Sequence, residues 1–199
     1  MITMEIKKAN SLNDDIRETI GEIFVDAFFD SALKYISKNK EHLIKIFAPM
    51  FVLEHFYVAV VESKIAGIIA CNDRNNSCVN IKKNIIVKYI GKFKGFFIYH
   101  IIKNSFSNYS KKFKINTNEK TAVIEILATN SKFRRMGIAS SLMDYVIAFP
   151  DFNHYVLEVI DINKNAIELY KKYGFKETHR KKFNQSKEFD YFVYMKYSK

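Results

Sequence analysis

The stretch from Asn130 to Ala139 brings two arginines and two small residues together directly after an apolar segment. The first N–H groups of a helix have no partner within the helix and carry partial positive charge. Because Gly137 and Ala139 lack bulky side chains, a phosphate can approach such N–H groups closely. Arg134 and Arg135 can add charge-assisted contacts. We interpret this turn as a pyrophosphate cradle, although it is neither G-x-G-x-x-G nor a P-loop; the simpler alternative is a helix start with exposed arginines.

A second block lies about 25 residues downstream, on the next strand–helix unit. Its members are Asn163, Ala166, Leu169, Tyr170, Gly174 and Phe175. Together with Leu127-Ala128-Thr129 and Arg134-x-x-Gly137-x-Ala139, this block resembles the GNAT superfamily of acyl-CoA-dependent N-acetyltransferases in order and spacing. The resemblance covers roughly Ala122–Phe175, and two linked motifs are more specific than either alone.

The resemblance implies a fold and a cosubstrate. The expected fold is a mixed, mostly antiparallel sheet, flanked by helices, whose central parallel strand pair splays apart. The expected cosubstrate is acetyl-CoA, with no metal. Its pantetheine arm is expected to pair with the strand end, its pyrophosphate to rest on the turn, and an asparagine to bind from the facing loop; these residues are Leu127, Ala128, Thr129, Arg134, Arg135, Met136, Gly137, Ile138, Ala139, Ser140 and Asn163.

The implied activity is transfer of an acetyl group to a primary amine of a small molecule or a peptide. An ammonium must lose a proton before it attacks, and by analogy Glu125 is the candidate base. Glu125 precedes Leu127 by two residues on a strand, so we expect both on one face. Tyr170 is the family's usual donor to the departing thiolate. The alternatives are a substrate-binding or partly exposed Glu125 and a half-buried Tyr170 that only packs.

The elements that must position these residues are clearest in the last third of the chain. Expected strands are Glu5–Asn10, Tyr57–Glu62, Ile65–Cys71, Ala122–Thr129, His154–Ile160 and Phe189–Met195. Expected helices run from a cap at Ser11 or Asn13 to about Tyr35, then over Glu41–Phe56, Arg134–Phe149 and Asn163–Tyr173. This order predicts an α/β or α+β fold in which the two strands around the cradle are parallel.

Residues 85–108 form the most conspicuous stretch outside the motifs. Apolar residues recur there at helical spacing among lysines: Ile86, Ile90, Phe93, Phe97 and Ile101. Such a helix can lie on an anionic bilayer, but surface helices more often pack a stripe of this kind on a sheet. We expect packing on the sheet, in an insertion or a substrate-side element.

Composition sets the remaining expectations. The 199 residues predict one domain, residues 1–199. The net charge of +11 favours anionic partners but also fits a coding bias towards lysine. Cys71 and Cys78 predict free thiols of a cytoplasmic protein. We expect no signal peptide and no transmembrane segment.

Two alternatives to the transferase remain open at this stage. One is a basic module that binds RNA or an anionic surface through Lys82–Lys114, although nucleic acid is the less favoured partner. The other is a fold of this family that binds CoA without turnover. A homodimer is possible. The five histidines show no pair at metal-ligand spacing.

Overall fold

The computed structural model describes residues 3–116, 119–183 and 188–199, and within them one sheet organises the chain. Its seven described strands follow the order β1-β2-β3-β4-β5-β7-β6. They are β1 (Met4–Lys8), β2 (Phe56–Val61), β3 (Lys64–Asp73), β4 (Thr121–Thr129), β5 (His154–Ile160), β6 (Lys176–Lys182) and β7 (Tyr191–Ser198). All neighbours pair antiparallel except β4 and β5, which are parallel. The expected mixed, mostly antiparallel sheet with a central parallel pair is confirmed.

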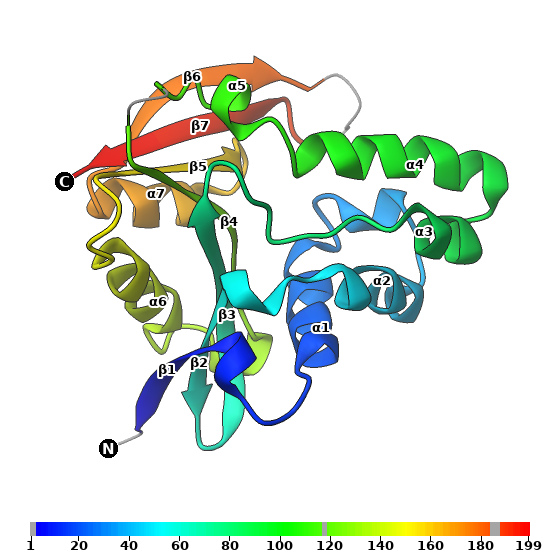
Figure 1. Cartoon of the computed structure of the whole chain (residues 1–199), viewed down its shortest axis with the longest axis horizontal. Helices are drawn as coiled ribbons and strands as arrows, with labels where there is room; N and C mark the ends of the chain where they lie inside the picture. Colours follow the sequence, from blue (N-terminus) through cyan, green and yellow to red (C-terminus); the bar gives the residue numbers. More distant parts are fainter. Residues whose placement is uncertain (1–2, 117–118, 184–187) are drawn as a thin grey trace.

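Helices cover both faces of the sheet (Figure 1). The α-helices are α1 (Arg17–Phe28), α2 (Lys40–Phe47), α3 (Lys83–Ile90), α4 (Lys92–Ser105), α5 (Tyr109–Lys112), α6 (Ile138–Ile147) and α7 (Lys164–Lys172). Short 3-10 turns are η1 (Ala9–Ser11), η2 (Leu33–Tyr35), η3 (Ala48–Met50), η4 (Leu53–His55) and η5 (Ser131–Phe133). Among the described residues, no helix is both long enough and apolar enough to cross a bilayer.

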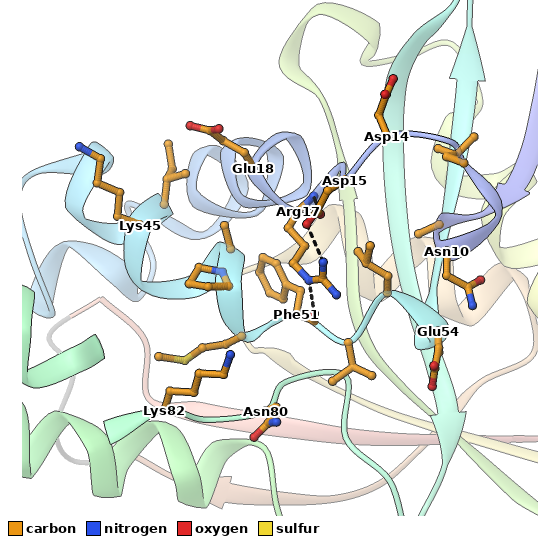
Figure 2. Close-up of a pocket in the computed structure, with 18 of the residues that line it drawn as sticks. Asn10, Asp14, Asp15, Arg17, Glu18, Lys45, Phe51, Glu54, Asn80 and Lys82 are labelled. Carbon is orange, nitrogen blue, oxygen red and sulfur yellow. Dashed lines mark hydrogen bonds and ion pairs between the residues drawn. The ribbon is translucent and has the colours of Figure 1, made fainter. Parts of the chain in front are cut away.

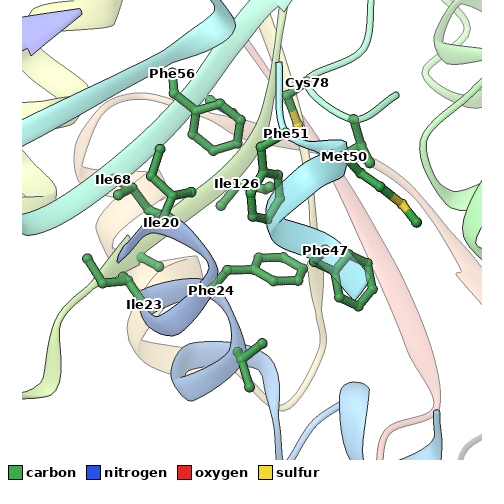
Figure 3. Packing of buried hydrophobic residues seen from close by; sticks show 14 of the residues in the cluster. Ile20, Ile23, Phe24, Phe47, Met50, Phe51, Phe56, Ile68, Cys78 and Ile126 are labelled. Carbon is green, nitrogen blue, oxygen red and sulfur yellow. The ribbon is translucent and has the colours of Figure 1, made fainter. Parts of the chain in front are cut away.

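Each face has its own apolar core. On the face of α1 and α2, the rings of Phe24, Phe47 and Phe51 meet with centroids 5.0–5.5 Å apart, next to strand residues such as Ile126 (Figure 3). On the other face, α6 and α7 bury Leu142 and Tyr170 against the central strands. The central strands are therefore apolar on both sides, as a doubly covered sheet requires.

The expected helix ends were wrong where side chains bind the backbone differently. Ser11 donates its hydroxyl to the Lys8 carbonyl within a 3-10 turn instead of capping a helix. The first helix begins only at Arg17, whose N–H is accepted by the Asp15 carboxylate at 3.0 Å. The helix expected over Glu41–Phe56 ends at Phe47, just before a 3-10 turn that contains Pro49. Proline cannot continue the ladder of helical hydrogen bonds.

The continuous helix expected over residues 85–108 was also wrong. Gly91, with a φ of +93°, separates α3 from α4. The break turns the second half of the stripe outward, because α4 buries Gly95, Ile98 and Ile102 instead. Phe97 is consequently exposed and does not pack on the sheet.

The sequence analysis missed one strand and predicted the bounds of two other elements well. β6 has the sequence KETHRKK and no apolar alternation, so it gave no strand signal. β5 has the expected bounds, and α7 lies within the expected helix. Cys71 and Cys78 are free and buried, as expected for thiols, and burial raises the pKa of each.

A glycine under α6 sets how closely that helix approaches the sheet. A Cβ at Gly67 of β3 would lie 2.5 Å from Ile138 Cγ2 and 3.1 Å from the Ala128 carbonyl oxygen. We therefore expect Gly67→Ala to lower the free energy of unfolding by about 1–3 kcal/mol. Urea denaturation measures the change.

The double variant Gly67→Ala/Ile138→Ala is the matched test of this contact. Because it removes the colliding methyl group, its loss of stability should be smaller than the sum of the two single losses. Strict additivity would show that Gly67 does not limit the approach of α6.

Candidate functional site

The two parallel strands separate halfway along their length. β4 pairs with β5 only from Thr121–His154 to Ile124–Leu157, although β4 continues to Thr129 and β5 to Ile160. Leu127, Ala128 and Thr129 pair with β3 on their other edge. Their edge towards β5 has no strand partner within the described residues. Such an edge is a template for an extended ligand.

A β-bulge at Glu125 accompanies the separation. On β3, Ala70 pairs with Ile126 and Cys71 with Ile124, so Glu125 is the extra residue. A bulge bends its strand and changes the alternation of side chains. Leu127 packs with the core under α6, whereas Glu125 contacts residues on the opposite face. The expectation that Glu125 and Leu127 share a face was wrong, because period two does not continue through a bulge.

The Glu125 carboxylate is the centre of a buried polar cluster. It accepts hydrogen bonds from the Asn72 side-chain amide (2.5 Å), the Cys78 N–H (2.8 Å), the Ser77 hydroxyl (3.3 Å) and the Tyr109 hydroxyl. An ionised carboxylate has about four acceptor positions, so these donors occupy its capacity. Burial and then the charge of Glu125 raise the pKa of Tyr109, which keeps its phenol protonated as a donor.

The partners of Glu125 could not be expected from the sequence. Asn72, Ser77 and Cys78 are 47–53 positions away from Glu125 along the chain, and Tyr109 is 16 positions away. No local motif joins them. Asn72 Oδ1 is itself buried without a hydrogen-bond partner in the described structure, so the cluster holds one further acceptor that a water or ligand can satisfy.

The turn before α6 has the geometry of an anion cradle. Arg135 and Gly137 both have positive φ, +65° and +76°. Gly137 is the N-cap of α6, and no side chain in the described structure caps that end. The N–H groups that open α6, on Ile138, Ala139 and Ser140, are the donors that lack helical partners. The helix therefore begins at Ile138, later than the expected Arg134, because the positive-φ residues are not helical.

Space and charge at this turn also suit an anion. A Cβ built on Gly137 meets no atom within 4 Å, so the space beside this residue is open. The Arg134 side chain is exposed, and its Nη2 lies 3.9 Å from an Asp26 carboxylate oxygen, too far for a hydrogen bond. Met136 is exposed as well. Arg134 is thus free to turn towards a bound phosphate.

The second block follows β5. Asn163 caps α7 by accepting the Ala166 N–H at 3.2 Å, and its side chain is exposed. Tyr170 is buried, and burial raises its pKa to about 12. No described residue hydrogen-bonds the Tyr170 hydroxyl, so it is a donor that a ligand can use.

Tyr173 connects the two blocks. Its hydroxyl donates to the Ser140 carbonyl (2.8 Å) and approaches the Asp144 carboxylate at 2.7 Å. α7 is thereby fixed against the first turn of α6. The residues expected to bind the cosubstrate therefore lie on two adjoining strand–helix units, while Glu125 faces the other side of the sheet.

A cavity lies away from these residues. It has a volume of about 970 Å³ and is lined by residues 9–18, 44–54 and neighbours such as Lys82 (Figure 2). Arg17 is held there by the Asp15 carboxylate (2.7 Å) and the Phe51 carbonyl (3.0 Å). A second cavity of about 500 Å³ lies beside Cys71 and Phe149. Neither cavity is lined by a residue expected to bind the cosubstrate.

Two connections meet on the side that Glu125 faces. The Tyr35 hydroxyl and the Lys34 ammonium, from the α1–α2 connection, each contact the Glu188 carboxylate at 3.0 Å. Glu188 belongs to the β6–β7 connection, of which residues 184–187 lie outside the described residues.

Within the described ranges, no group of three or more His, Cys, Asp or Glu residues is arranged to hold a metal ion.

Comparisons with known proteins agree with this geometry. The family model described as Acetyltransferase (GNAT) family matches residues 17–175. No curated protein matches the chain by sequence.

Solved structures share the fold at low identity. An N-acetyltransferase from Staphylococcus aureus Mu50 has a TM-score of 0.61 at 20% identity, over 97% of this chain and 100% of that chain. Arabidopsis thaliana NAA60 in complex with acetyl-CoA has a TM-score of 0.58 at 17% identity, over 99% and 100%. The NatC complex bound to Gag peptide and CoA gives 0.58 at 15% identity, over 98% of each chain. At such identities, the likeness concerns the fold.

The buried cluster yields a prediction about stability. Tyr109→Phe removes a donor to Glu125, and we expect it to lower the free energy of unfolding at pH 7 by about 1–3 kcal/mol. Because the folded-state pKa of Tyr109 is raised, the wild-type advantage is complete below the unfolded tyrosine pKa of about 10 and shrinks as pH rises beyond it. Urea denaturation between pH 7 and pH 11 measures both effects.

Tyr145→Phe is the matched control, because Tyr145 is exposed and its ring contacts those of Tyr57 and Phe149. Its effect should stay within about 0.5 kcal/mol. Equal effects of the two substitutions would mean that the hydrogen bond to Glu125 contributes nothing measurable.

Proposed function

We propose that this chain, which belongs to the acetyltransferase (GNAT) family, transfers the acetyl group of acetyl-CoA to a primary amine of a small molecule or peptide. The observation that carries the proposal is the separation of β4 from β5 after Ile124 and Leu157, beside the uncapped N-terminus of α6. An extended arm and a diphosphate need those two features side by side.

The cosubstrate fits the residues at this gap. The free edge of Leu127, Ala128 and Thr129 offers backbone groups to the amides of a pantetheine arm. The N–H groups that open α6 offer positive dipole ends to the pyrophosphate, at the turn of the two arginines. The exposed Asn163 amide can bind from the facing loop. Two structures of the same fold support the choice, because one holds acetyl-CoA and the other holds a peptide and CoA.

Acetyl-CoA supplies an activated thioester. The amine nitrogen forms a bond to the carbonyl carbon, the bond from that carbon to sulfur breaks, and the second proton that the nitrogen loses passes to the departing thiolate or to water. An ammonium cannot attack, so its proton must leave first. We propose that Glu125 receives this proton, directly or through one water. Its 3.3 Å contact with the Ser77 hydroxyl is the longest of its hydrogen bonds and the one that an incoming amine can most easily replace.

Tyr170 is proposed to stabilise the departing sulfur. A thiol has a reference pKa near 8.5, and the pKa of the Tyr170 hydroxyl is higher, about 12. Full proton transfer from this phenol is therefore uphill, and the role that the acidity favours is a hydrogen bond from the Tyr170 hydroxyl to the developing thiolate. A backbone N–H at the free edge of β4 can stabilise the negative charge on the carbonyl oxygen.

A free-thiol release assay over a panel of small amines and peptides tests the proposal, together with melting curves with and without acetyl-CoA. A ligand at about 100 times its Kd adds about 2.7 kcal/mol to the stability of the fold that binds it. A rise in Tm with amine-dependent thiol release supports the transferase. A rise in Tm without release from any acceptor would indicate CoA binding without turnover, and no rise would contradict the site.

Tyr170→Phe tests the proposed donor. We expect kcat to fall about 10²-fold, since a group that stabilises developing charge is lost, while the Kd for acetyl-CoA stays within a factor of about two because the ring still packs. The rate of thiol release measures kcat, and calorimetry measures the Kd for acetyl-CoA. Tyr145→Phe is again the control, and unchanged turnover in Tyr170→Phe would remove the hydroxyl from the mechanism.

Gly137→Glu tests the cradle. Because φ at Gly137 is +76° and its Cβ position is open, Ala and Glu should impose a similar backbone strain on the free protein. The glutamate also brings negative charge to the pyrophosphate site, so we expect it to weaken acetyl-CoA binding by more than about 10²-fold, well beyond Gly137→Ala. Calorimetry on both variants decides the matter; equal affinities would place the pyrophosphate elsewhere.

A further inference from the structure

Nearly all the positive charge excess of the chain comes from one segment. Residues 74–116, here called the basic segment, contain ten Lys and Arg residues and no Asp or Glu. The rest of the chain has 22 basic and 21 acidic residues and is close to neutral. The excess is therefore concentrated around α3, α4 and α5, and a uniform bias of composition does not account for it.

Within this segment, α4 presents an apolar face to solvent. The exposed fractions are 88% for Phe93, 66% for Phe97, 44% for Phe96 and 46% for Ile101. At 100° per residue these four side chains share the side of α4 that lies opposite its buried residues, together with the exposed polar residues His100 and Asn104. Single exposed apolar residues are ordinary, but four on one helix face form a patch.

Lysines flank the patch along its length. Lys92 and Lys103 lie on one border of the helix face and Lys94 on the other, by the same helical geometry. Lys94 Nζ donates to the Ile36 carbonyl at 2.9 Å, and Lys83 of α3 lies 4.7 Å from the centre of the Phe96 ring. Aromatic side chains pointing outward between lysines are the arrangement of a helix that lies in a membrane interface.

We propose that α4 docks this chain on an anionic lipid surface, with Phe93 and Phe97 entering the acyl boundary and the flanking Lys92, Lys94 and Lys103 next to acidic headgroups. In the view of Figure 1, α4 lies at the edge of the molecule, on the other side of the sheet from α6 and α7. Docking there leaves the cradle at α6 accessible. A helix of 14 residues has a length of about 21 Å, so the binding is peripheral and reversible.

Charge and residue type favour a lipid surface over a second copy of the chain or RNA as the partner of α4. A second copy of the chain would bring one basic segment against another, which like charges oppose. RNA would satisfy the charge, but base recognition relies on stacking platforms and on arginine. α3, α4 and α5 contain no arginine, and the patch includes the aliphatic Ile101. In a lipid interface, the apolar side chains meet the acyl chains and the lysines beside them meet the anionic headgroups.

Vesicle sedimentation with the full-length chain tests the proposal. We expect binding to phosphatidylcholine vesicles that contain about 30% phosphatidylserine, binding at least about tenfold weaker to pure phosphatidylcholine, and weakening by added salt. Phe93→Ser/Phe97→Ser should weaken binding by more than about tenfold. Both side chains are exposed, so the variant should fold, which a melting curve checks. Lys64→Glu/Lys176→Glu, an equal charge change outside the basic segment, should cost clearly less than Lys92→Glu/Lys103→Glu.

A conservative variant and a reporter complete the test. Phe93→Leu/Phe97→Leu should keep vesicle binding within about threefold, because leucine inserts into lipid but cannot stack on bases. The chain has no Trp, so Phe93→Trp gives a single fluorophore whose emission should shift to the blue on anionic vesicles, whereas Tyr145→Trp on α6 should not shift. Absence of vesicle binding, equal binding to neutral vesicles, RNA binding that the leucine variant loses, or a dimer that the serine variant dissociates would each overturn the proposal.

Discussion

Two strands can share a ladder of hydrogen bonds only while they run side by side, and β4 leaves β5 after Ile124 and Leu157. The extra residue in β4, Glu125, accompanies this change of direction. Everything around the site follows from the divergence. The backbone groups of Leu127–Thr129 stay unpaired towards β5, α6 begins directly beyond them, and the bulge turns a carboxylate to the opposite face of the sheet. One irregularity in this strand thus places Glu125 and Leu127 on opposite faces of the sheet.

The local parts of the site were predictable because short stretches encode them. Gly137 and Ala139 predict a tight turn before a helix. The structure shows Gly137 in the left-handed region there, at a helix N-terminus that no side chain of the described residues caps. β5 appears with the expected bounds because its β-branched run is bounded by polar turns. The parallel pair also follows from the order of elements, since two strands joined by a helix, as β4 and β5 are by α6, commonly pair parallel. The role of these residues with a ligand stays a prediction.

Features that depend on distant residues were not predictable. The hydrogen bonds to Glu125 come from Asn72 of β3, from the loop that follows β3 and from Tyr109 of α5, and no spacing rule connects these segments. The bulge reverses the alternation that placed Glu125 beside Leu127. The face of α4 was misjudged because an apolar stripe does not report whether a partner exists: Gly95 lies against Val87 of α3, which selects the buried side and leaves Phe93 outside. Tertiary packing, not periodicity, decided these cases.

The missed strand also bears on how the protein behaves at high concentration. β6 forms one edge of the sheet, and its basic residues Lys176, Arg180, Lys181 and Lys182 are all exposed. An unpaired margin invites a foreign strand to add on and begin a fibril-like stack. A row of cations repels such additions from chains of the same kind. The polar sequence that gave β6 no strand signal therefore disfavours the addition of another chain at this edge of the sheet.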